Sequence, residues 1–211
     1  EKLKQKIVAN MRLNKQHAGD FSQWWSFIFS WDNLKTRTLT DFVDGNYKFD
    51  PLNTYVFADE TVQVWGYQDQ VFTKLFLKII SPCFKHIISD KCLHLLGPNG
   101  VKVAIKKTIA ALETGQYRYF ARFDVKDFYA SIDRKILLSM LNKHFDDPRT
   151  LDYLQQIVTV PVIKNAAIIN PSKGIPRRSS ISNFFGALYL SPIDKLFENN
   201  PNIFYLRYQD D

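Results

Sequence analysis

Hydrophobic and polar residues follow two different periods along this chain of 211 residues. Spacings of three and four residues are typical of amphipathic helices, and they predict helices over residues 68–88, 101–112, 134–145, 151–160 and about 180–197. Alternation at every second position is typical of half-buried strands and predicts a strand over residues 117–124. Short runs rich in apolar and β-branched residues predict further strands over residues 55–57, 61–65 and 203–206. The chain is therefore expected to combine helices with strands.

Turn-forming residues divide these elements. Pro82 is expected to bend the first helix, and Lys164-Asn165 to turn a short hairpin over residues 162–169. Asp146-Asp147-Pro148 is expected to end the helix that precedes it. Residues 21–66 are rich in aromatic side chains and are expected to turn at Asp32-Asn33, among other places.

The bulk composition narrows the class of protein. A hydrophobic content of 45% and an aromatic content of 15% exclude a disordered chain. The net charge of +7 and the pI near 9.3 favour a polyanionic partner such as nucleic acid. Residues 1–20 are basic, and they form either an arm that touches nucleic acid or a solvated helix face.

Cysteine usage and hydropathy bear on the compartment. Cys83 and Cys92 have no metal-like spacing, so both are expected to be buried free thiols in a reducing environment. The apolar stretch from Trp24 to Trp31 is far shorter than the roughly 20 residues that cross a membrane. No signal peptide is visible. A cytoplasmic protein without a membrane partner is expected.

Acidic residues follow two of the predicted strands. Asp124 ends one strand, and Asp210-Asp211 follows the other. Any single carboxylate of this kind could cap a helix or face solvent. An acidic strand end that faces an acidic hairpin, however, supplies the oxygen ligands that two Mg²⁺ ions roughly 3.5–4 Å apart require. The pattern therefore predicts a site for two-metal phosphoryl transfer.

Three segments resemble the reverse transcriptases, in particular those of bacterial retrons and group II introns. Arg122-Phe-Asp-Val-Lys-Asp-Phe-Tyr-Ala-Ser-Ile-Asp133 is similar to the first catalytic palm motif of that family. Gly174-Ile-Pro-Arg-Arg, with the helix that runs on to Asp194, resembles the second motif, and Tyr205-Leu-Arg-Tyr-Gln-Asp-Asp211 matches the third. The resemblance covers residues 47–211 and is strongest from 117 onward.

The resemblance implies an α+β fold with the fingers and palm of a right-hand polymerase. Residues 1–46 would be an N-terminal extension, 47–116 the fingers, and 117–211 a palm with an antiparallel sheet and helices packed on one face. The return strand after Asp211, the primer grip and the thumb would lie outside this chain. Residues 1–211 alone are therefore expected to lack polymerase activity.

The resemblance also assigns roles to the acidic residues and to one tyrosine. Asp124 and Asp210 would bind both Mg²⁺ ions, with Mn²⁺ as an alternative, and Asp211 would be a supporting third carboxylate. Tyr129 falls where the family places the side chain that clashes with a ribose 2′-hydroxyl, although a core aromatic residue is the alternative. His94 is expected to be structural.

Further residues are expected to bind substrate by the same resemblance. The turn from Gly174 to Pro176 and Ser182 would line the nucleotide and the template, and Tyr208 would lie under the primer end or serve in packing. The full set of expected substrate-binding residues is Tyr129, Val125, Lys126, Asp127, Phe128, Pro176, Arg177, Arg178, Ser182, Tyr208 and Gln209.

The chain departs from the family pattern in two places. The second motif usually reads Pro-Gln-Gly, whereas here it is Pro176-Arg177-Arg178. Arginine in place of glycine is costly if the position needs a positive φ, but two guanidinium groups suit phosphate contacts; a solvated turn is the alternative. The second departure is the absence of Lys and Arg between Phe49 and Thr73. Lys48, Lys74, Lys126 or the arginine pair would substitute, or nucleotide binding is weakened.

The leading hypothesis is an RNA-directed DNA polymerase whose partners are an RNA template, a DNA or RNA primer and deoxynucleoside triphosphates. The alternatives are a related polymerase with untemplated or protein-primed DNA synthesis in phage defence, and a catalytically weakened RNA-binding relative. An associated non-coding RNA or accessory protein is a further partner to consider.

Overall fold

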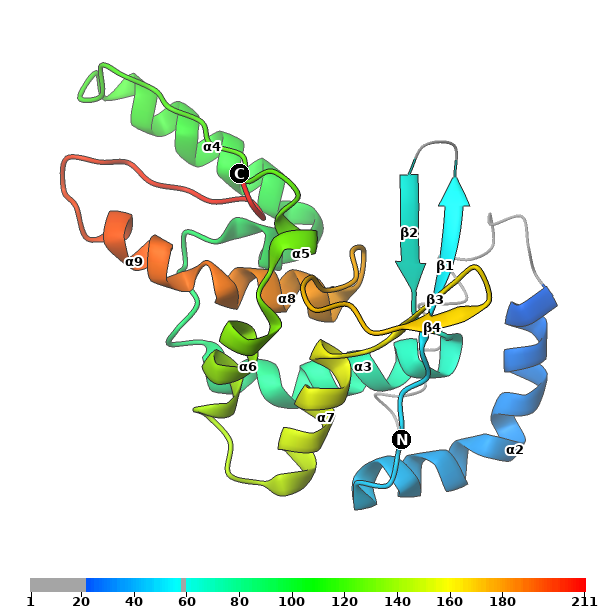
Figure 1. The fold of residues 1–211 in the computed structure, drawn as a ribbon. Helices are drawn as coiled ribbons and strands as arrows, with labels where there is room; N and C mark the ends of the chain where they lie inside the picture. Colours follow the sequence, from blue (N-terminus) through cyan, green and yellow to red (C-terminus); the bar gives the residue numbers. More distant parts are fainter. Residues whose placement is uncertain (1–21, 58–59) are drawn as a thin grey trace. The chain divides into compact units, whose positions relative to one another are not determined.

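The computed structural model describes residues 22–57 and 60–211, which form an α+β fold (Figure 1). The described residues divide into two compact units. Unit 1 comprises the described residues up to Ile79 together with Arg134–Ser172, and unit 2 comprises Ile80–Asp133 together with Lys173–Asp211. Residues 134–172 thus pack with residues that precede 80, and the division into extension, fingers and palm stays a prediction.

Unit 1 contains a four-stranded sheet of order β2-β1-β3-β4. Its elements in chain order are α2 (Ser22–Asp44), β1 (Leu52–Phe57), β2 (Glu60–Val64), α3 (Tyr67–Ile80, apart from its last residue), α6 (Arg134–Asn142), α7 (Pro148–Val158), β3 (Val162–Lys164) and β4 (Ala167–Ile169). The β1–β2 and β3–β4 pairs are antiparallel, which confirms both predicted hairpins, while β1 and β3 pair in parallel.

Aromatic side chains fill the core of unit 1. Phe42 stacks on Tyr153 with ring centroids 4.8 Å apart and on Phe72 at the same distance. The Tyr47 hydroxyl donates a hydrogen bond of 2.6 Å to Asp69 Oδ1 within this core. Burial raises the pKa of Asp69 to about 7, so this carboxyl group titrates near neutral pH.

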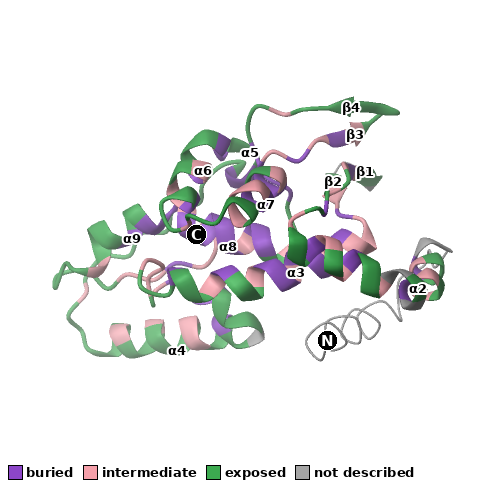
Figure 2. Cartoon of the chain, turned by 90° about the horizontal axis from the view of Figure 1, so that it is seen from below, coloured by how far each residue is buried: buried purple, intermediate pink, exposed green. Residues whose placement is uncertain are grey.

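Unit 2 is built around a buried helix, α8 (Ser180–Tyr189), which is largely purple in Figure 2. The other elements of this unit are the 3₁₀ segments η1 (Ser81–Phe84) and η2 (Leu93–Asn99), and the helices α4 (Gly100–Glu113), α5 (Phe128–Ser131) and α9 (Ser191–Glu198). Gly186 of α8 permits the close approach of α5, since a Cβ there would lie 3.0 Å from Phe128 Cε1.

Several predicted helix boundaries are wrong. A single helix, α2, runs through Asp32-Asn33 because Trp24, Phe27 and Trp31 share one face and contact one another. Asp147 caps the start of α7 by accepting a hydrogen bond from the Thr150 amide, instead of ending the preceding helix.

Helices were also expected to be longer at two other places. The helix predicted over 180–197 is divided into α8 and α9 at Leu190, just before Pro192. Pro82 lies at the start of η1, so α3 ends at Ile80 instead of bending. Cys83 and Cys92 are both free as expected, but Cys83 is exposed.

The strands predicted over residues 117–124 and 203–206 are irregular in the structure. Next to residues 203–206, Arg207 forms an isolated β-bridge with Cys92, and this is the only β-bridge of residues 203–211 within the described chain. A strand requires a continuous hydrogen-bonded neighbour, and these segments have none among the described residues. These two segments therefore do not contribute strands to the antiparallel palm sheet that was predicted over 117–211.

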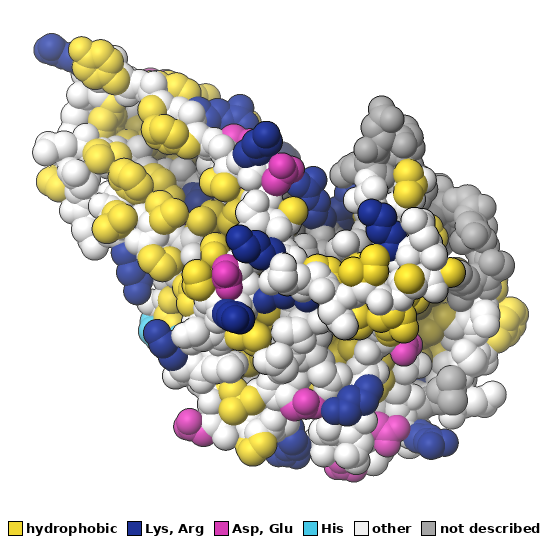
Figure 3. Space-filling view, in the orientation of Figure 1, with side chains coloured by type: hydrophobic (Ala, Val, Ile, Leu, Met, Phe, Trp, Pro, Cys, Tyr) yellow, Lys and Arg dark blue, Asp and Glu magenta, His cyan; other side chains and the backbone are white. Residues whose placement is uncertain are grey.

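The irregular segments leave apolar side chains exposed. Tyr119 is 94% exposed, and Phe120 and Phe123 are 76% and 78% exposed. Figure 3 shows hydrophobic side chains gathered over this part of unit 2. Residues 1–20, predicted to be a basic arm or helix, lie outside the described residues. No helix within residues 22–57 and 60–211 is long and apolar enough to cross a membrane.

Candidate active site

The residues that the sequence singled out for chemistry lie in unit 2, and a guanidinium group links two of their segments. Arg122 donates to Asp211 Oδ1 from Nη2 at 2.6 Å and from Nε at 2.8 Å. The hydrogen bond and charge of Asp211, and then the charge of Asp124, raise the pKa of Arg122. Two carboxylates that are distant in the sequence therefore act on one cation.

The donor chemistry of this locus fits Mg²⁺. Asp124, Asp210 and Asp211 offer only carboxylate oxygens, the ligands that hard divalent cations prefer, and Asp211 pairs with the Arg122 guanidinium group. Within the described residues, no three His, Cys, Asp or Glu side chains are gathered closely enough to hold a metal ion as they stand. The structure thus supplies suitable ligands without an assembled cage.

Tyr129 is buried in unit 2 with its hydroxyl pointing to α8. The hydroxyl donates to Asn183 Oδ1 at 3.2 Å. Burial, followed by the charge of Asp210, raises the pKa of Tyr129 to about 12, so the phenol stays protonated at neutral pH. The burial of Tyr129 agrees with the alternative prediction, a core aromatic residue. The contact of Tyr129 with ribose stays a prediction.

The stretch between Asp124 and Tyr129 turns sharply into α5. Asp127 adopts a positive φ of 51° as it caps this helix, and its carboxylate lies 3.9 Å from Arg177. Val125, Lys126 and Asp127 are exposed, whereas Phe128 is buried. A ligand at this stretch would therefore meet residues 125–127, since Phe128 lies in the core.

The loop that carries the second motif is tied to α5 by backbone hydrogen bonds. The Gly174 amide donates to Ile132 O at 2.8 Å, and the Ile175 amide donates to Tyr129 O at 2.9 Å. Gly174 has φ of 82°, and a Cβ there would lie 2.9 Å from Ala130 O, so only glycine fits.

The arginine pair follows directly in this loop. Pro176 is buried, while Arg177 and Arg178 are exposed. Arg178 has φ of 63°, which confirms that the position usually held by glycine needs a left-handed backbone. The chain therefore keeps arginine at a strained position beside the predicted site.

Ser182 is fully buried at the start of α8. Its amide donates to Ser179 Oγ at 3.1 Å, and the two hydroxyl oxygens lie 2.7 Å apart. Both serines thus serve the helix N-terminus, as capping residues do. The expected contact of Ser182 with nucleotide or template stays a prediction.

Residues 208–211 form a tight turn, called the 208–211 turn below. The Tyr208 amide donates to Asp211 O at 2.9 Å, and the Asp211 amide donates to Tyr208 O at 3.2 Å. The Tyr208 ring contacts the His94 ring at 6.1 Å between centroids, and a Cβ on Gly100 would lie 3.4 Å from it. These contacts favour the packing role of Tyr208.

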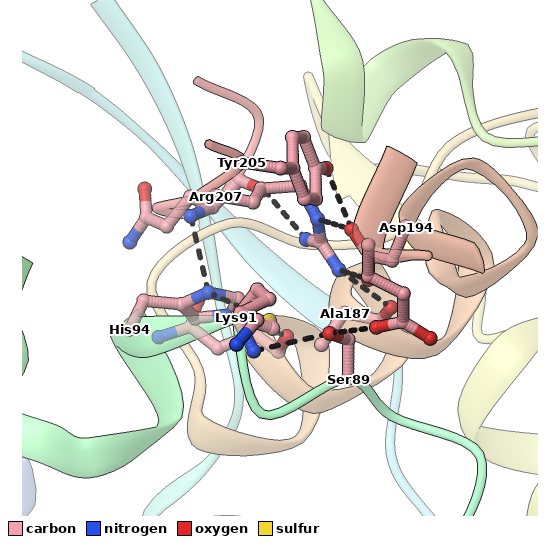
Figure 4. Close-up of polar contacts among 11 residues, drawn as sticks. Ser89, Lys91, His94, Ala187, Asp194, Tyr205 and Arg207 are labelled. Atoms are coloured by element: carbon pink, nitrogen blue, oxygen red, sulfur yellow. Dashed lines mark hydrogen bonds and ion pairs between the residues drawn. The ribbon is translucent and has the colours of Figure 1, made fainter. Parts of the chain in front are cut away.

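Sequence reasoning missed a buried ion pair beneath this turn (Figure 4). Arg207 and Asp194 are 4% and 0% exposed by side chain, with Nη2 and Oδ2 2.6 Å apart. Burial alone would lower the pKa of Arg207, but the hydrogen bond and charge of Asp194 are among the effects that raise it. The sequence did contain a signal for this ion pair: Asp194 lies on the apolar face of a helix, and a buried carboxylate needs a cationic partner.

Comparisons with known proteins bear on the fold alone. No family model and no curated protein matches the chain. A partial Cas6-RT-Cas1–Cas2 complex shares its fold with a TM-score of 0.58 at 16% identity, over 99% of this chain and 35% of that one. A Cas6-RT-Cas1–Cas2 complex matches with the same score and identity, over 99% of this chain and 22% of that one. The chain thus spans about a third or less of the chains that it matches.

Proposed function

We propose that this chain is the fingers and palm portion of a reverse transcriptase, an RNA-directed DNA polymerase that extends a primer 3′-hydroxyl with deoxynucleotides. The observation that carries the proposal is the contact of Arg122, two residues before Asp124, with Asp211 at 2.6 Å. Segments 89 residues apart thereby meet where the sequence predicts the chemistry. The fold shared with complexes that contain a reverse transcriptase supports the same function.

Asp124, Asp210 and Asp211 are the residues that would hold two Mg²⁺ ions, with Mn²⁺ as an alternative. When bound, such ions supply an acidified primer hydroxyl and countercharge for the pyrophosphate leaving group. Arg122 adds a fixed cation from the protein at the same locus. The chain would thus contribute mainly position and countercharge.

Selection of deoxynucleotides would rest on Tyr129. Its ring is held between the hydrogen bond to Asn183 and the glycine surface at Gly186, so it cannot easily turn aside. The resemblance places this ring next to the ribose, where it would clash with a 2′-hydroxyl. Replacement of Tyr129 by Ala is expected to increase the use of ribonucleotides, and Tyr129→Phe is expected to retain discrimination.

Arg177 and Arg178 would bind phosphates of the nucleotide or the template. Both side chains are exposed at the loop that follows Gly174, and Asp127 lies at 3.9 Å from Arg177. Guanidinium groups bind phosphate oxygens in a bidentate manner. These arginines would compensate for the absence of Lys and Arg between Phe49 and Thr73.

The proposal further includes an accessory protein partner and a role in defence. Both neighbouring structures are complexes in which Cas proteins accompany the reverse transcriptase. If Arg177 and Arg178 do not compensate, the absence of Lys and Arg from segment 49–73 favours the alternative of untemplated or protein-primed synthesis, because the segment has no positive charge to bind a triphosphate. A cytoplasmic location stays a prediction.

One assay on the full-length protein separates these functions. Incorporation of labelled dNTP or NTP is measured with and without an RNA template, with Asp124→Ala as the control. Template-dependent dNTP incorporation that the control lacks would support a reverse transcriptase. Untemplated incorporation would support the related polymerase, and tight RNA binding without incorporation would overturn both in favour of a binding protein.

A further inference from the structure

Gln209, the second residue of the 208–211 turn, is held through both of its backbone polar groups. Its amide donates to His94 Nδ1 at 3.0 Å, and its carbonyl oxygen accepts from Arg207 Nη1 at 2.7 Å. Its φ is 60°, a backbone conformation that residues other than glycine adopt only at a cost. Such strain persists where the surrounding contacts enforce it.

The His94 ring is oriented by its other nitrogen. Nε2 lies 3.1 Å from the carbonyl oxygen of Asn183 in α8, and a carbonyl only accepts hydrogen bonds. Nε2 therefore carries the hydrogen, which leaves Nδ1 as the acceptor for the Gln209 amide. Since His94 is 8% exposed, it is packed in this orientation.

The Arg207 side chain is fixed just as firmly. Its Nε and Nη2 donate to the Asp194 carboxylate at 2.7 and 2.6 Å, and Nη2 also donates to Ala187 O at 3.1 Å (Figure 4). The Tyr205 hydroxyl donates to the same carboxylate at 2.7 Å. With these groups engaged, Nη1 is directed to the carbonyl oxygen of Gln209.

We infer that His94 and Arg207 are positioning residues. Their buried side chains hold the amide and the carbonyl group of Gln209 and so fix the orientation of Asp210 and Asp211. The role in catalysis rests on the proposed function, because it assumes that these two carboxylates serve the reaction. The holding of the turn is independent of it. Asp194 is the anchor of Arg207, and Asn183 is the anchor of His94.

A matched pair of variants at position 94 tests this inference. Asn carries an acceptor oxygen near the position of imidazole Nδ1, whereas Gln carries a donor nitrogen near that of Nε2. His94→Asn therefore keeps the contact with Gln209, and His94→Gln keeps the contact with Asn183. A residue that only fills space would respond similarly to both changes.

The measurement is NMR hydrogen exchange at the Gln209 amide, with the Leu188 amide of α8 as the reference for global stability. Protection of Gln209 is expected to stay within about threefold in His94→Asn and to fall about tenfold in His94→Gln, the value of one hydrogen bond. The Asp210 and Asp211 amide resonances are expected to shift only in His94→Gln. Equal loss of protection in both variants, or no loss, would overturn the inference.

A second variant guards against a fold defect at position 94. Arg207→Lys keeps a positive charge beside Asp194, but one ammonium group cannot replace the planar fork that also reaches Gln209. In this variant the hydrogen-exchange rate of the Gln209 amide is expected to rise about tenfold, while the rate of the Leu188 amide changes less. Unchanged Gln209 exchange in this variant would contradict the role of Arg207.

Activity separates failure of this inference from failure of the proposed function. If the full-length wild-type protein incorporates no nucleotide, the proposed function fails, while the exchange data still decide whether the turn is held. If the wild type is active, kcat is expected to fall about tenfold in His94→Gln, in proportion to the lost hydrogen bond, with KM nearly unchanged. Equal kcat in both His94 variants would then reject the positioning role.

Discussion

In unit 1 the strand-like segment 52–57 pairs with 60–64 over five residue pairs and becomes a hairpin, whereas in unit 2 the strand-like segments 117–124 and 203–206 stay irregular. Both patterns are typical of strands. Alternation decides which side chains share a face, but the ladder is made by the backbone of a neighbour. The difference teaches that the same pattern yields a strand only where a partner strand lies beside it.

The two units also differ in how they use charge. Unit 1 places an ion pair at its surface, where Lys48 Nζ lies 3.0 Å from Asp152 Oδ2. Unit 2 buries an ion pair beneath the 208–211 turn. Exposed pairs contribute little to stability, whereas a buried charge that loses its partner is costly. The contrast can be measured directly.

The largest effect is expected from Asp194→Ala in unit 2. The free energy of unfolding should fall by about 5 kcal/mol, because Arg207 is left buried without a counterion and Tyr205 loses its acceptor. Urea denaturation measures the change. The matched variant in unit 1, Lys48→Ala, should cost less than about 1 kcal/mol. Similar losses in the two variants would contradict the contrast.

Apolar packing should give the next largest difference. Phe42→Ala removes a ring that stacks on Phe72 and Tyr153, and it is expected to cost about 4 kcal/mol. Phe120→Ala in unit 2 changes a side chain that is 76% exposed, and a change within about 0.5 kcal/mol is expected. A large loss from Phe120→Ala in denaturation experiments would show that residues 117–124 are packed in solution.

The buried carboxyl of Asp69 is expected to make unit 1 sensitive to pH. Its folded pKa of about 7 lies above the usual value of 3.8, so the folded state binds the proton more tightly. This stabilisation is complete below the unfolded pKa and is lost as the pH rises through 7. The loss should total about 4 kcal/mol, since one pKa unit corresponds to about 1.4 kcal/mol.

Asp69→Asn provides the control for this titration. An amide of the same shape can still accept from the Tyr47 hydroxyl, but it does not titrate. Denaturation of this variant between acid and neutral pH should therefore show a much flatter dependence than the wild type. A wild-type profile that rises toward neutral pH would refute the sign of the effect.

The smallest expected effect concerns the strained arginine of unit 2. Arg178→Gly should raise stability by about 0.5 kcal/mol, since relief of the left-handed backbone exceeds the added entropy of the unfolded chain. Arg177→Gly, at a residue without positive φ, should lower stability.

If Arg178 binds phosphate, Arg178→Gly should also reduce the salt dependence of RNA binding by about one unit of slope. An unchanged slope favours the solvated turn.

Much of the local structure could be predicted from the chain itself. The 55–65 and 162–169 hairpins and the helix after Gly100 follow their patterns, since neighbouring residues decide them. The departure at Arg178 raised the question of a positive φ, and the structure answered it with φ of 63°. Helix ends were less predictable: at Asp147-Pro148 a cap and a stop use the same residue types.

The sequence by itself determined where the acidic residues stand and that helices form after Gly66 around residues 68–80, 101–112, 134–142, 151–158 and 180–197, because those properties depend on residue type and short-range spacing. Only the tertiary structure decided that Arg122 meets Asp211 and that His94 and Arg207 hold Gln209. It also decided that residues 117–124 lack a ladder. Contacts between residues roughly a hundred positions apart depend on how helices and loops pack, and periodicity along the chain carries no record of that packing.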